Sequence, residues 1–222
     1  MRQPFAITID GPAASGKTST AYQVAEALGF HHVDSGALYR AATAAALRAA
    51  PAGNWSEADV LEAVRIVEME ARQASFCPLL DGEESADEIR GEAVTSKVSV
   101  VAKMSAVRDW VNAQVRHLAD LHDVVVDGRD IGTVVLPSAR VKVFLLAESR
   151  ERARRRLLQR LGRAGTEPEL DEEAAKLAQR DALDAVQTVP APDAIMLDTT
   201  DMSQAEQVRQ IIDIARAAGA SE

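Results

Sequence analysis

Five short strand-like runs, all but one of them largely apolar, divide the chain, and longer stretches with helical periodicity separate most of them. The runs cover residues 5–9, 31–33, 124–126, 141–146 and 194–197, and the exception is His31-His32-Val33. Near-continuous apolarity over so few residues is typical of strands buried on both faces of a parallel sheet. Parallel strands need crossover connections, which the intervening helices supply. The pattern predicts an α/β fold, a doubly wound five-stranded parallel sheet with helices on both faces.

The helical segments carry recognisable boundaries. Residues 17–28 form a predicted helix that ends at Gly29, and the closing helix begins with a capping box at Ser203 and Glu206 and ends near Gly219. Residues 40–50 are helical by propensity alone. From Glu92 to Leu121 a helical stripe in two pieces is formed by Val94, Val98, Val101, Val107, Val111, Val115 and Leu118.

The pattern of residue types changes between residues 51 and 91, and this segment interrupts the alternation of strands and helices. Pro51-Ala52-Gly53-Asn54 breaks the helix, and Ser56 with Asp59 resembles the capping box of a short helix. Residues 64–80 alternate like a strand and lead to a turn at Asp81-Gly82. The sequence therefore predicts a small, partly β insertion at 51–91 within a core made of residues 1–50 and 92–222.

The segment after the first strand has the spacing of a phosphate-binding loop. Gly11-Pro12-Ala13-Ala14-Ser15-Gly16-Lys17-Thr18 reads G-x-x-x-x-G-K-T and runs directly into a helix through Ser19. The two glycines allow the backbone to wrap a polyphosphate with its amides at the positive end of the helix dipole. A glycine-rich turn without a ligand is the weaker alternative, because strand, motif and helix occur together. We expect Gly11, Pro12, Ala13, Ala14, Ser15, Gly16, Lys17, Thr18 and Ser19 to bind ATP.

A magnesium site is expected beside this loop. The hydroxyl of Thr18 suits Mg²⁺ bound with ATP, and Lys17 supplies a point charge for the outer phosphates. Asp127 ends the third apolar run, where phosphate-loop enzymes carry an acidic residue that helps to hold magnesium or its waters. The alternative is that Asp127 only caps the next turn.

A run of arginines suggests a lid over residues 150–166. Arg150, Arg152, Arg154, Arg155, Arg156, Arg160 and Arg163 crowd one short helix, where like charges repel unless an anion offsets them. We expect Arg152, Arg155 and Arg156 to be catalytic by closing on a transferring phosphoryl group. The alternative is a solvated helix whose arginines pair with Glu148, Glu151 and other acids. In the next helix, Arg180 and Asp184 alone would indicate only a surface ion pair.

Composition narrows the function classes. The 222 residues are 47% hydrophobic and 27% charged, which is ordinary for one domain with an insertion or for two small ones. A net charge of −9 argues against a nucleic-acid partner, so positive charge for an anionic ligand must be local. No apolar run is long enough for a membrane span, and the first strand starts too near Met1 for a signal peptide.

Cysteine and histidine usage adds little chemistry. Cys77 is the single cysteine, which excludes an intramolecular disulfide and fits a reducing cytoplasm. His31 and His32 have no partner cluster, so we interpret them as strand residues and not as metal ligands. The expected location is the cytoplasm.

Several further motifs together resemble the bacterial cytidylate kinase family. They are Ile9-Asp10-Gly11-Pro12, the segment 34–40 (Asp-Ser-Gly-Ala-Leu-Tyr-Arg), Glu88-Ile89-Arg90, the segment 127–135 that begins Asp-Gly-Arg-Asp, Arg180-Asp181-x-x-Asp184, and Leu197-Asp198-Thr199-Thr200. The likeness spans nearly the whole chain. The segment 127–135 is the most specific part, whereas the phosphate loop is shared by many kinases.

The resemblance implies a P-loop nucleoside monophosphate kinase that moves the γ-phosphoryl group of ATP to CMP, and also to dCMP, with Mg²⁺. It implies a monomer whose insertion binds the monophosphate and closes with the lid. By position, Ser99, Arg108 and Asp130 match residues that read cytosine, and Arg40 and Arg129 match residues around the acceptor phosphate. Ser35 lies in the matching acceptor segment, and Arg180 and Asp184 match ribose contacts. One departure is Gln187, where the family usually has an arginine.

Three other functions are compatible with parts of the pattern. A kinase for another small acceptor, such as another nucleoside monophosphate or shikimate, would share the phosphate loop but not the segment 127–135. A regulatory GTPase needs an Asn-Lys-x-Asp element, yet Asn54 and Asn112 are followed by Trp55 and Ala113. A catalytically impaired, nucleotide-binding paralogue is suggested only by Gln187.

Overall fold

The five predicted strands form the parallel part of one central sheet. They are β1 (Ala6–Asp10), β2 (His31–Asp34), β6 (Val124–Gly128), β7 (Val141–Leu146) and β8 (Ile195–Asp198). In the computed structural model, which describes residues 3–220, they lie in the order β2-β6-β1-β7-β8 and every neighbouring pair is parallel. The predicted α/β architecture is confirmed.

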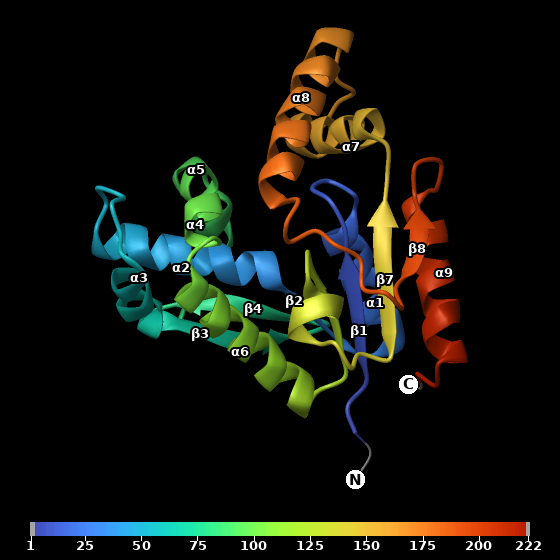
Figure 1. Ribbon diagram of the computed structural model, residues 1–222, viewed down its shortest axis with the longest axis horizontal. Coiled ribbons are helices and arrows are strands. Elements are labelled where there is room, and N and C mark those ends of the chain that lie inside the picture. Colours follow the sequence, from blue (N-terminus) through green and yellow to red (C-terminus); the bar gives the residue numbers. More distant parts are fainter. Residues whose placement is uncertain (1–2, 221–222) are drawn as a thin grey trace.

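Helices cover both faces of this sheet (Figure 1). On one face, α1 (Lys17–Leu28) and α9 (Gln204–Ala217) pack with Ile7, Ile9 and Val125. On the other face, α2 (Ser35–Ala49) and α6 (Ser105–Leu121) pack with Val124 and Val126. Successive strand residues point to opposite faces, so this division of three consecutive valines shows that β6 is buried on both sides.

Most predicted helix boundaries agree with the structure. Gly29 ends α1 with φ 66°, and the closing capping box of Ser203 and Glu206 is formed. The long stripe divides into α5 (Glu92–Val101) and α6, and all seven of its apolar residues are buried. The predicted start of α2 at residue 40 is wrong, because Asp34 caps the helix by accepting a hydrogen bond from the Ala37 amide at 3.0 Å.

The insertion contains more structure than its pattern indicated. It comprises α3 (Glu57–Ala63), η1 (Val64–Ile66), β3 (Val67–Arg72), β4 (Ser75–Leu80), β5 (Glu83–Glu84) and α4 (Ala86–Arg90). The single alternating segment predicted for 64–80 is wrong, since β3 and β4 form an antiparallel hairpin. Its turn contains Gln73 at φ 38° and has none of the usual turn residues, whereas the predicted Asp81-Gly82 turn is present.

The hairpin also enlarges the central sheet. Strand β4 pairs in parallel with β2, and β5 pairs with β4, so the sheet has eight strands in place of the predicted five. This pairing satisfies the backbone groups along the outer side of β2, which would otherwise form an open edge. The segment 51–91 is therefore continuous with the main sheet through β4.

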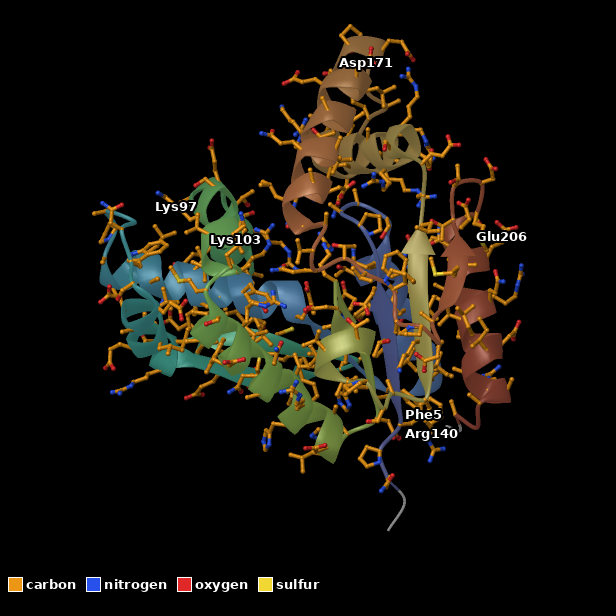
Figure 2. The ribbon with its side chains drawn as sticks, viewed as in Figure 1. Phe5, Lys97, Lys103, Arg140, Asp171 and Glu206 are labelled. Atoms are coloured by element: carbon orange, nitrogen blue, oxygen red, sulfur yellow. The ribbon has the colours of Figure 1, made fainter. Side chains whose placement is uncertain are left out.

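The two ends of the sheet differ in what lies beside them. The parallel strands end together near Asp10, Asp34 and Asp127, and α7 (Ser149–Leu161) and α8 (Glu167–Asp184) project beyond this edge (Figure 1). At the opposite end, Figure 2 shows Phe5 beside Arg140, whose guanidinium carbon lies 5.4 Å from the ring centroid. Among residues 3–220 we find no helix with the length and apolarity required to cross a membrane.

Candidate active site

The candidate phosphate loop makes a tight turn between β1 and α1. Gly11 has φ 148° and Gly16 has φ 93°, conformations that side chains rarely adopt. A Cβ atom at Gly11 would lie 2.4 Å from the carbonyl oxygen of Leu145. The loop therefore needs glycine for both its torsions and its close approach to β7.

Lys17 is the first residue of α1 and is almost entirely buried. Its Nζ donates to the carbonyl oxygen of Pro12 at 2.7 Å. Burial lowers the pKa of the Lys17 ammonium well below its usual value, and the nearby charge of Arg129 lowers this pKa further. A buried cation of this kind is stabilised by an anion brought into the loop.

Thr18 and Asp127, the two predicted metal residues, are in contact. The Thr18 hydroxyl donates to Asp127 Oδ2 at 2.7 Å, and Asp127 Oδ1 lies 2.7 Å from Nε2 of His32. Burial raises the pKa of the Asp127 carboxyl, but the hydrogen bond from His32, its charge and the Thr18 hydroxyl outweigh burial, so the net pKa lies below the ordinary value. The carboxylate is held ionised beside the phosphate loop.

His32 was interpreted only as a strand residue, and its contact with Asp127 was missed. No group of three or more histidine, cysteine, aspartate or glutamate side chains with metal-binding geometry occurs within residues 3–220. A polar residue in a short buried strand is the signal that could have indicated this contact, because a buried imidazole needs a partner.

Asp10 is a second buried residue whose role the sequence pattern does not indicate. Its carboxylate accepts from the amides of Ile131 at 3.0 Å and Gly132 at 2.8 Å, at the start of the turn η2 (Ile131–Val135). Burial raises the pKa of Asp10 to about 6, against the lowering effect of these two hydrogen bonds. The residue that precedes the phosphate loop thus fixes the backbone directly after Asp130.

The predicted cytosine readers come from three different elements. Arg108 on α6 forms an ion pair with Asp130 and lies 5.9 Å from the ring centroid of Tyr39. Burial raises the pKa of the Asp130 carboxyl, although Arg108 acts in the opposite direction. Ser99 is half-buried on α5, and its hydroxyl has no hydrogen-bond partner within residues 3–220. Arg108 and Asp130 therefore form a polar pair, while Ser99 remains unpaired.

The predicted phosphate and ribose residues are held by contacts with the phosphate loop, α8 and α5. Arg129 donates to the Gly11 carbonyl oxygen at 3.2 Å and to Asp184 at 3.3 Å, and Arg180 Nε lies 3.8 Å from the same carboxylate. Arg40 is held by the hydroxyl of Thr95 at 3.0 Å. These contacts connect the loop with α8, and α2 with α5.

Ser35 has a different set of contacts. Its buried hydroxyl donates to the carbonyl oxygen of Asp127 at 2.7 Å. A Cβ atom at Gly128 would lie 2.7 Å from this hydroxyl oxygen, so the Ser35 side chain packs closely against the Gly128 backbone. In this state Ser35 joins α2 to the end of β6.

Most arginines of α7 pair with carboxylates, as the solvated-helix alternative proposed. Arg150 pairs with Glu167 and Asp171, and the latter is labelled on α8 in Figure 2. Arg154 pairs with Glu151 within α7, Arg160 pairs with Glu173, and Arg163, just beyond the end of α7, pairs with Glu169. The pairs with Glu167, Glu169, Asp171 and Glu173 join α7 and α8 into one unit.

Arg152 connects this unit to the phosphate loop. Its buried guanidinium donates to the Ala13 carbonyl oxygen at 3.0 Å and lies 2.6 Å from the carboxylate of Asp181. Asp181 in turn accepts from the Ala13 amide at 3.4 Å. Both polar groups of Ala13 are thereby held by side chains of α7 and α8, a brace that the sequence did not indicate.

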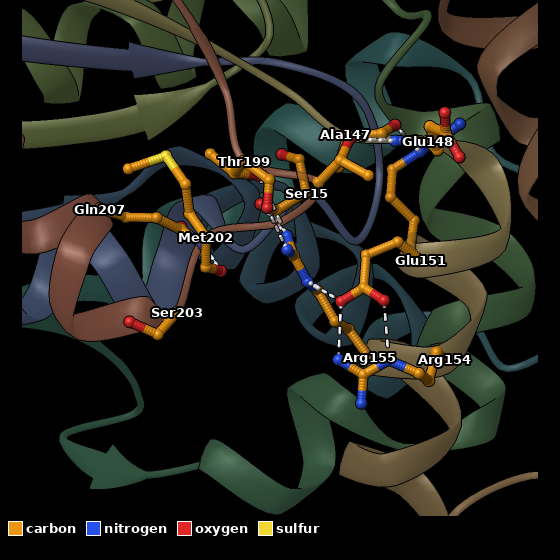
Figure 3. A network of polar contacts seen from close by, with 12 residues as sticks. Ser15, Ala147, Glu148, Glu151, Arg154, Arg155, Thr199, Met202, Ser203 and Gln207 are labelled. Atoms are coloured by element: carbon orange, nitrogen blue, oxygen red, sulfur yellow. Dashed lines mark hydrogen bonds and ion pairs between the residues drawn. The ribbon is translucent and has the colours of Figure 1, made fainter.

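Arg155 forms a second connection, shown in Figure 3. It donates to Glu151 at 2.8 Å, to the Thr199 hydroxyl at 3.1 Å and to the Ser15 carbonyl oxygen at 3.4 Å. The network joins α7, the phosphate loop and the loop after β8.

Arg156 differs from its neighbours. Of the seven arginines between 150 and 163, it alone has no ion pair with a described residue. Burial lowers the pKa of Arg180, and the charges of Arg129 and Arg156 lower it further. The same holds for Arg40, whose pKa is lowered by burial and then by Arg180 and Arg156. Arg40, Arg129, Arg156 and Arg180 therefore bring positive charge into one region beside the phosphate loop.

Comparison with known proteins decides between the kinase families. The profile described as "Cytidylate kinase" matches residues 7–217. The cytidylate kinase of Geobacillus kaustophilus is 44% identical over 220 residues, covering 96% of this chain and 97% of its own. The chain belongs to the cytidylate kinase family. The cytidylate kinase of Bacillus cereus (strain ATCC 10987) is 41% identical with the same coverage.

The match to the cytidylate kinase family covers the functional segments described above. The match includes the phosphate loop, the segment 127–135, and the helices α7, α8 and α9. It also includes Gln187, a half-buried residue whose backbone N–H donates to the Asp184 carbonyl oxygen at 2.9 Å. The departure from the usual arginine is thus next to the residues predicted to contact ribose.

Proposed function

We propose that this protein transfers the γ-phosphoryl group of ATP to CMP, giving ADP and CDP. The observation that carries the proposal is the convergence of cations beside the phosphate loop, which are Lys17, Arg40, Arg129, Arg156 and Arg180. The charges of Arg129, Arg156 and Arg180 lower the pKa values of neighbouring members, namely Lys17, Arg40 and Arg180. Such mutual repulsion is relieved when two phosphate-bearing substrates bind between them. Family membership supports the choice of ATP and CMP.

On the donor side, the amides of the loop from Gly11 to Thr18 and the Lys17 ammonium would bind the triphosphate. The oxygens of Thr18 and Asp127 fit magnesium, which prefers oxygen ligands and is held by few carboxylates. Bound magnesium would neutralise phosphate charge. The residues themselves align the donor and exclude water that would hydrolyse ATP.

On the acceptor side, the Asp130 carboxylate can accept from the exocyclic amine of cytosine, while Arg108 and Ser99 donate to the ring acceptors. Uracil presents a carbonyl to the carboxylate and an N–H to the donor, so both contacts would be mispaired. Arg40 and Arg129 would bind the acceptor phosphate, and Arg180 and Asp184 the ribose. We include dCMP as a second acceptor.

Arg156 is the lid residue that we expect to contact the transferring group. We expect Arg156→Ala to lower kcat about 30-fold. The variant loses a charge-assisted hydrogen bond to the transferring group, and the free energy of such a bond, about 2 kcal/mol, corresponds to a rate effect of this size. Arg154→Ala is the matched control: Arg154 lies on the same helix but pairs with Glu151, and it should keep wild-type kcat. Steady-state kinetics compare the two variants, and equal kcat values in both would contradict the role of Arg156.

Arg152 and Arg155 remain proposed catalytic residues that would change partners during closure. In the present state they hold the Ala13 and Ser15 carbonyl oxygens of the phosphate loop. We propose that the lid, residues 150–166, and the insertion, residues 51–91, close on the core when both substrates bind. X-ray scattering with a bisubstrate inhibitor should show a smaller radius of gyration than the free protein, and identical profiles would contradict closure.

Phosphorus NMR tests transfer directly. A mixture of the protein, ATP, magnesium and CMP should give the paired resonances of ADP and CDP with little inorganic phosphate. Inorganic phosphate alone would indicate hydrolysis, and an unchanged spectrum despite ATP binding would favour the impaired paralogue.

We further propose that the protein acts in the cytoplasm, where ATP and CMP are supplied, and that it works as a monomer. Light scattering would test the latter.

A further inference from the structure

His32 is a buried residue of β2. Within residues 3–220, the only hydrogen-bond partner of its imidazole is the Asp127 side chain. Nε2 lies 2.7 Å from Asp127 Oδ1, and the two side chains are 6% and 4% exposed. Burying an imidazole inside a sheet costs free energy unless it forms a hydrogen bond. The position therefore needs an explanation in terms of Asp127.

The ring is fixed from two directions. Tyr22 of α1 lies edge-on to it, with ring centroids 6.2 Å apart and an angle of 89° between the planes. The backbone of His32 is anchored in β2, where its amide donates to the Ala74 carbonyl oxygen at 2.7 Å. An imidazole held in this way defines the direction from which it meets the carboxylate.

The carboxylate of Asp127 has one oxygen for each partner. Oδ1 meets His32, and Oδ2 accepts from the Thr18 hydroxyl at 2.7 Å. Thr18 alone would leave the carboxylate plane free to turn about its Cβ–Cγ bond. The second contact fixes that plane, so that Oδ2 stays directed at the phosphate loop.

We propose that His32 is a positioning residue that orients Asp127 toward the magnesium ion of the bound nucleotide. The inference rests on the proposed function, because it needs magnesium beside Thr18 and Asp127. His32 Nε2–H donates to Oδ1 and leaves Oδ2 for the metal or its waters. Outer partners of this kind set the orientation and basicity of metal-binding carboxylates, and their loss typically costs 10–100-fold in metal affinity.

Binding of ADP measured by calorimetry, in saturating magnesium and in EDTA, tests this role without turnover. The ratio of the two affinities is the magnesium enhancement. In His32→Leu we expect the enhancement to fall about tenfold while the affinity in EDTA stays unchanged. His32→Gln retains an N–H donor and should recover most of the enhancement. The matched control is His31→Leu, since His31 is the adjacent residue of β2 but packs on Phe76 and His122, and its enhancement should match wild type.

The outcomes separate this inference from the proposed function. An unchanged enhancement in His32→Leu, or an equal loss of affinity in magnesium and EDTA, would overturn the positioning role alone. A wild-type protein with no magnesium enhancement would overturn both. Nitrogen-15 NMR of the wild-type imidazoles gives a test that needs no variant. His32 must carry its proton on Nε2 in the nucleotide complex, and a proton on Nδ1 alone would contradict the proposal.

Discussion

Lys17→Met is expected to lower kcat/KM for ATP about 10³-fold while leaving the protein folded. One preorganised donor to a charged phosphate is worth an effect of this size in a site that excludes water. Burial lowers the pKa of Lys17 in the folded protein, so at neutral pH its charge costs folding free energy, and removing it should not reduce the free energy of unfolding. Steady-state kinetics and thermal unfolding measure the two effects.

Lys142→Met provides the control for Lys17→Met. Lys142 is also buried, but its Nζ lies 2.8 Å from the carboxylate of Asp193 and forms an ion pair with it, not with the phosphate loop. The kcat/KM of Lys142→Met should stay near the wild-type value. Near-normal kcat/KM in Lys17→Met, or an equal loss in both variants, would contradict the role of Lys17.

Asp130→Ala is expected to lower kcat/KM for CMP about 100-fold and to change the value for UMP much less. The variant removes the acceptor for the cytosine amine and leaves Arg108 without its ion pair. For UMP it removes a carboxylate that would face a carbonyl, so the preference for CMP should largely disappear. The ratio of the two kcat/KM values measures this directly.

The neighbouring carboxylate gives the control for Asp130→Ala. Asp109 is exposed on α6 next to Arg108, and Asp109→Ala should keep the wild-type preference. An unchanged ratio in Asp130→Ala would show that the base is read by other residues.

The features that follow a strong local pattern could be predicted from the sequence. The five buried strands and the phosphate loop depend on apolar runs and on glycines, which act within a few residues. The hairpin of β3 and β4 depends on a turn at Gln73 without a turn signal and on pairing with β2, a strand about 40 residues away in the chain. Such long-range pairing leaves little trace in a single sequence.

The individual roles of the arginines were equally hidden. Their number on α7 indicated an anion site, but their partners lie on α8 and in the phosphate loop. The structure thus separates Arg152 and Arg155, which hold loop carbonyl oxygens, from Arg156, which has no ion pair with a described residue. Spacing along one helix cannot make that distinction, because all three positions share adjoining faces of the helix.

The most direct measurement of the central claim is ATP-dependent ADP release, with magnesium, across CMP, dCMP, UMP, AMP, GMP and shikimate. We predict the highest kcat/KM for CMP, followed by dCMP, and far lower values for the other four. A preference for any of those four acceptors would contradict the assignment of the base pocket, even with the phosphate loop correctly identified. ATP binding without release in the presence of any acceptor would contradict the assignment as a kinase.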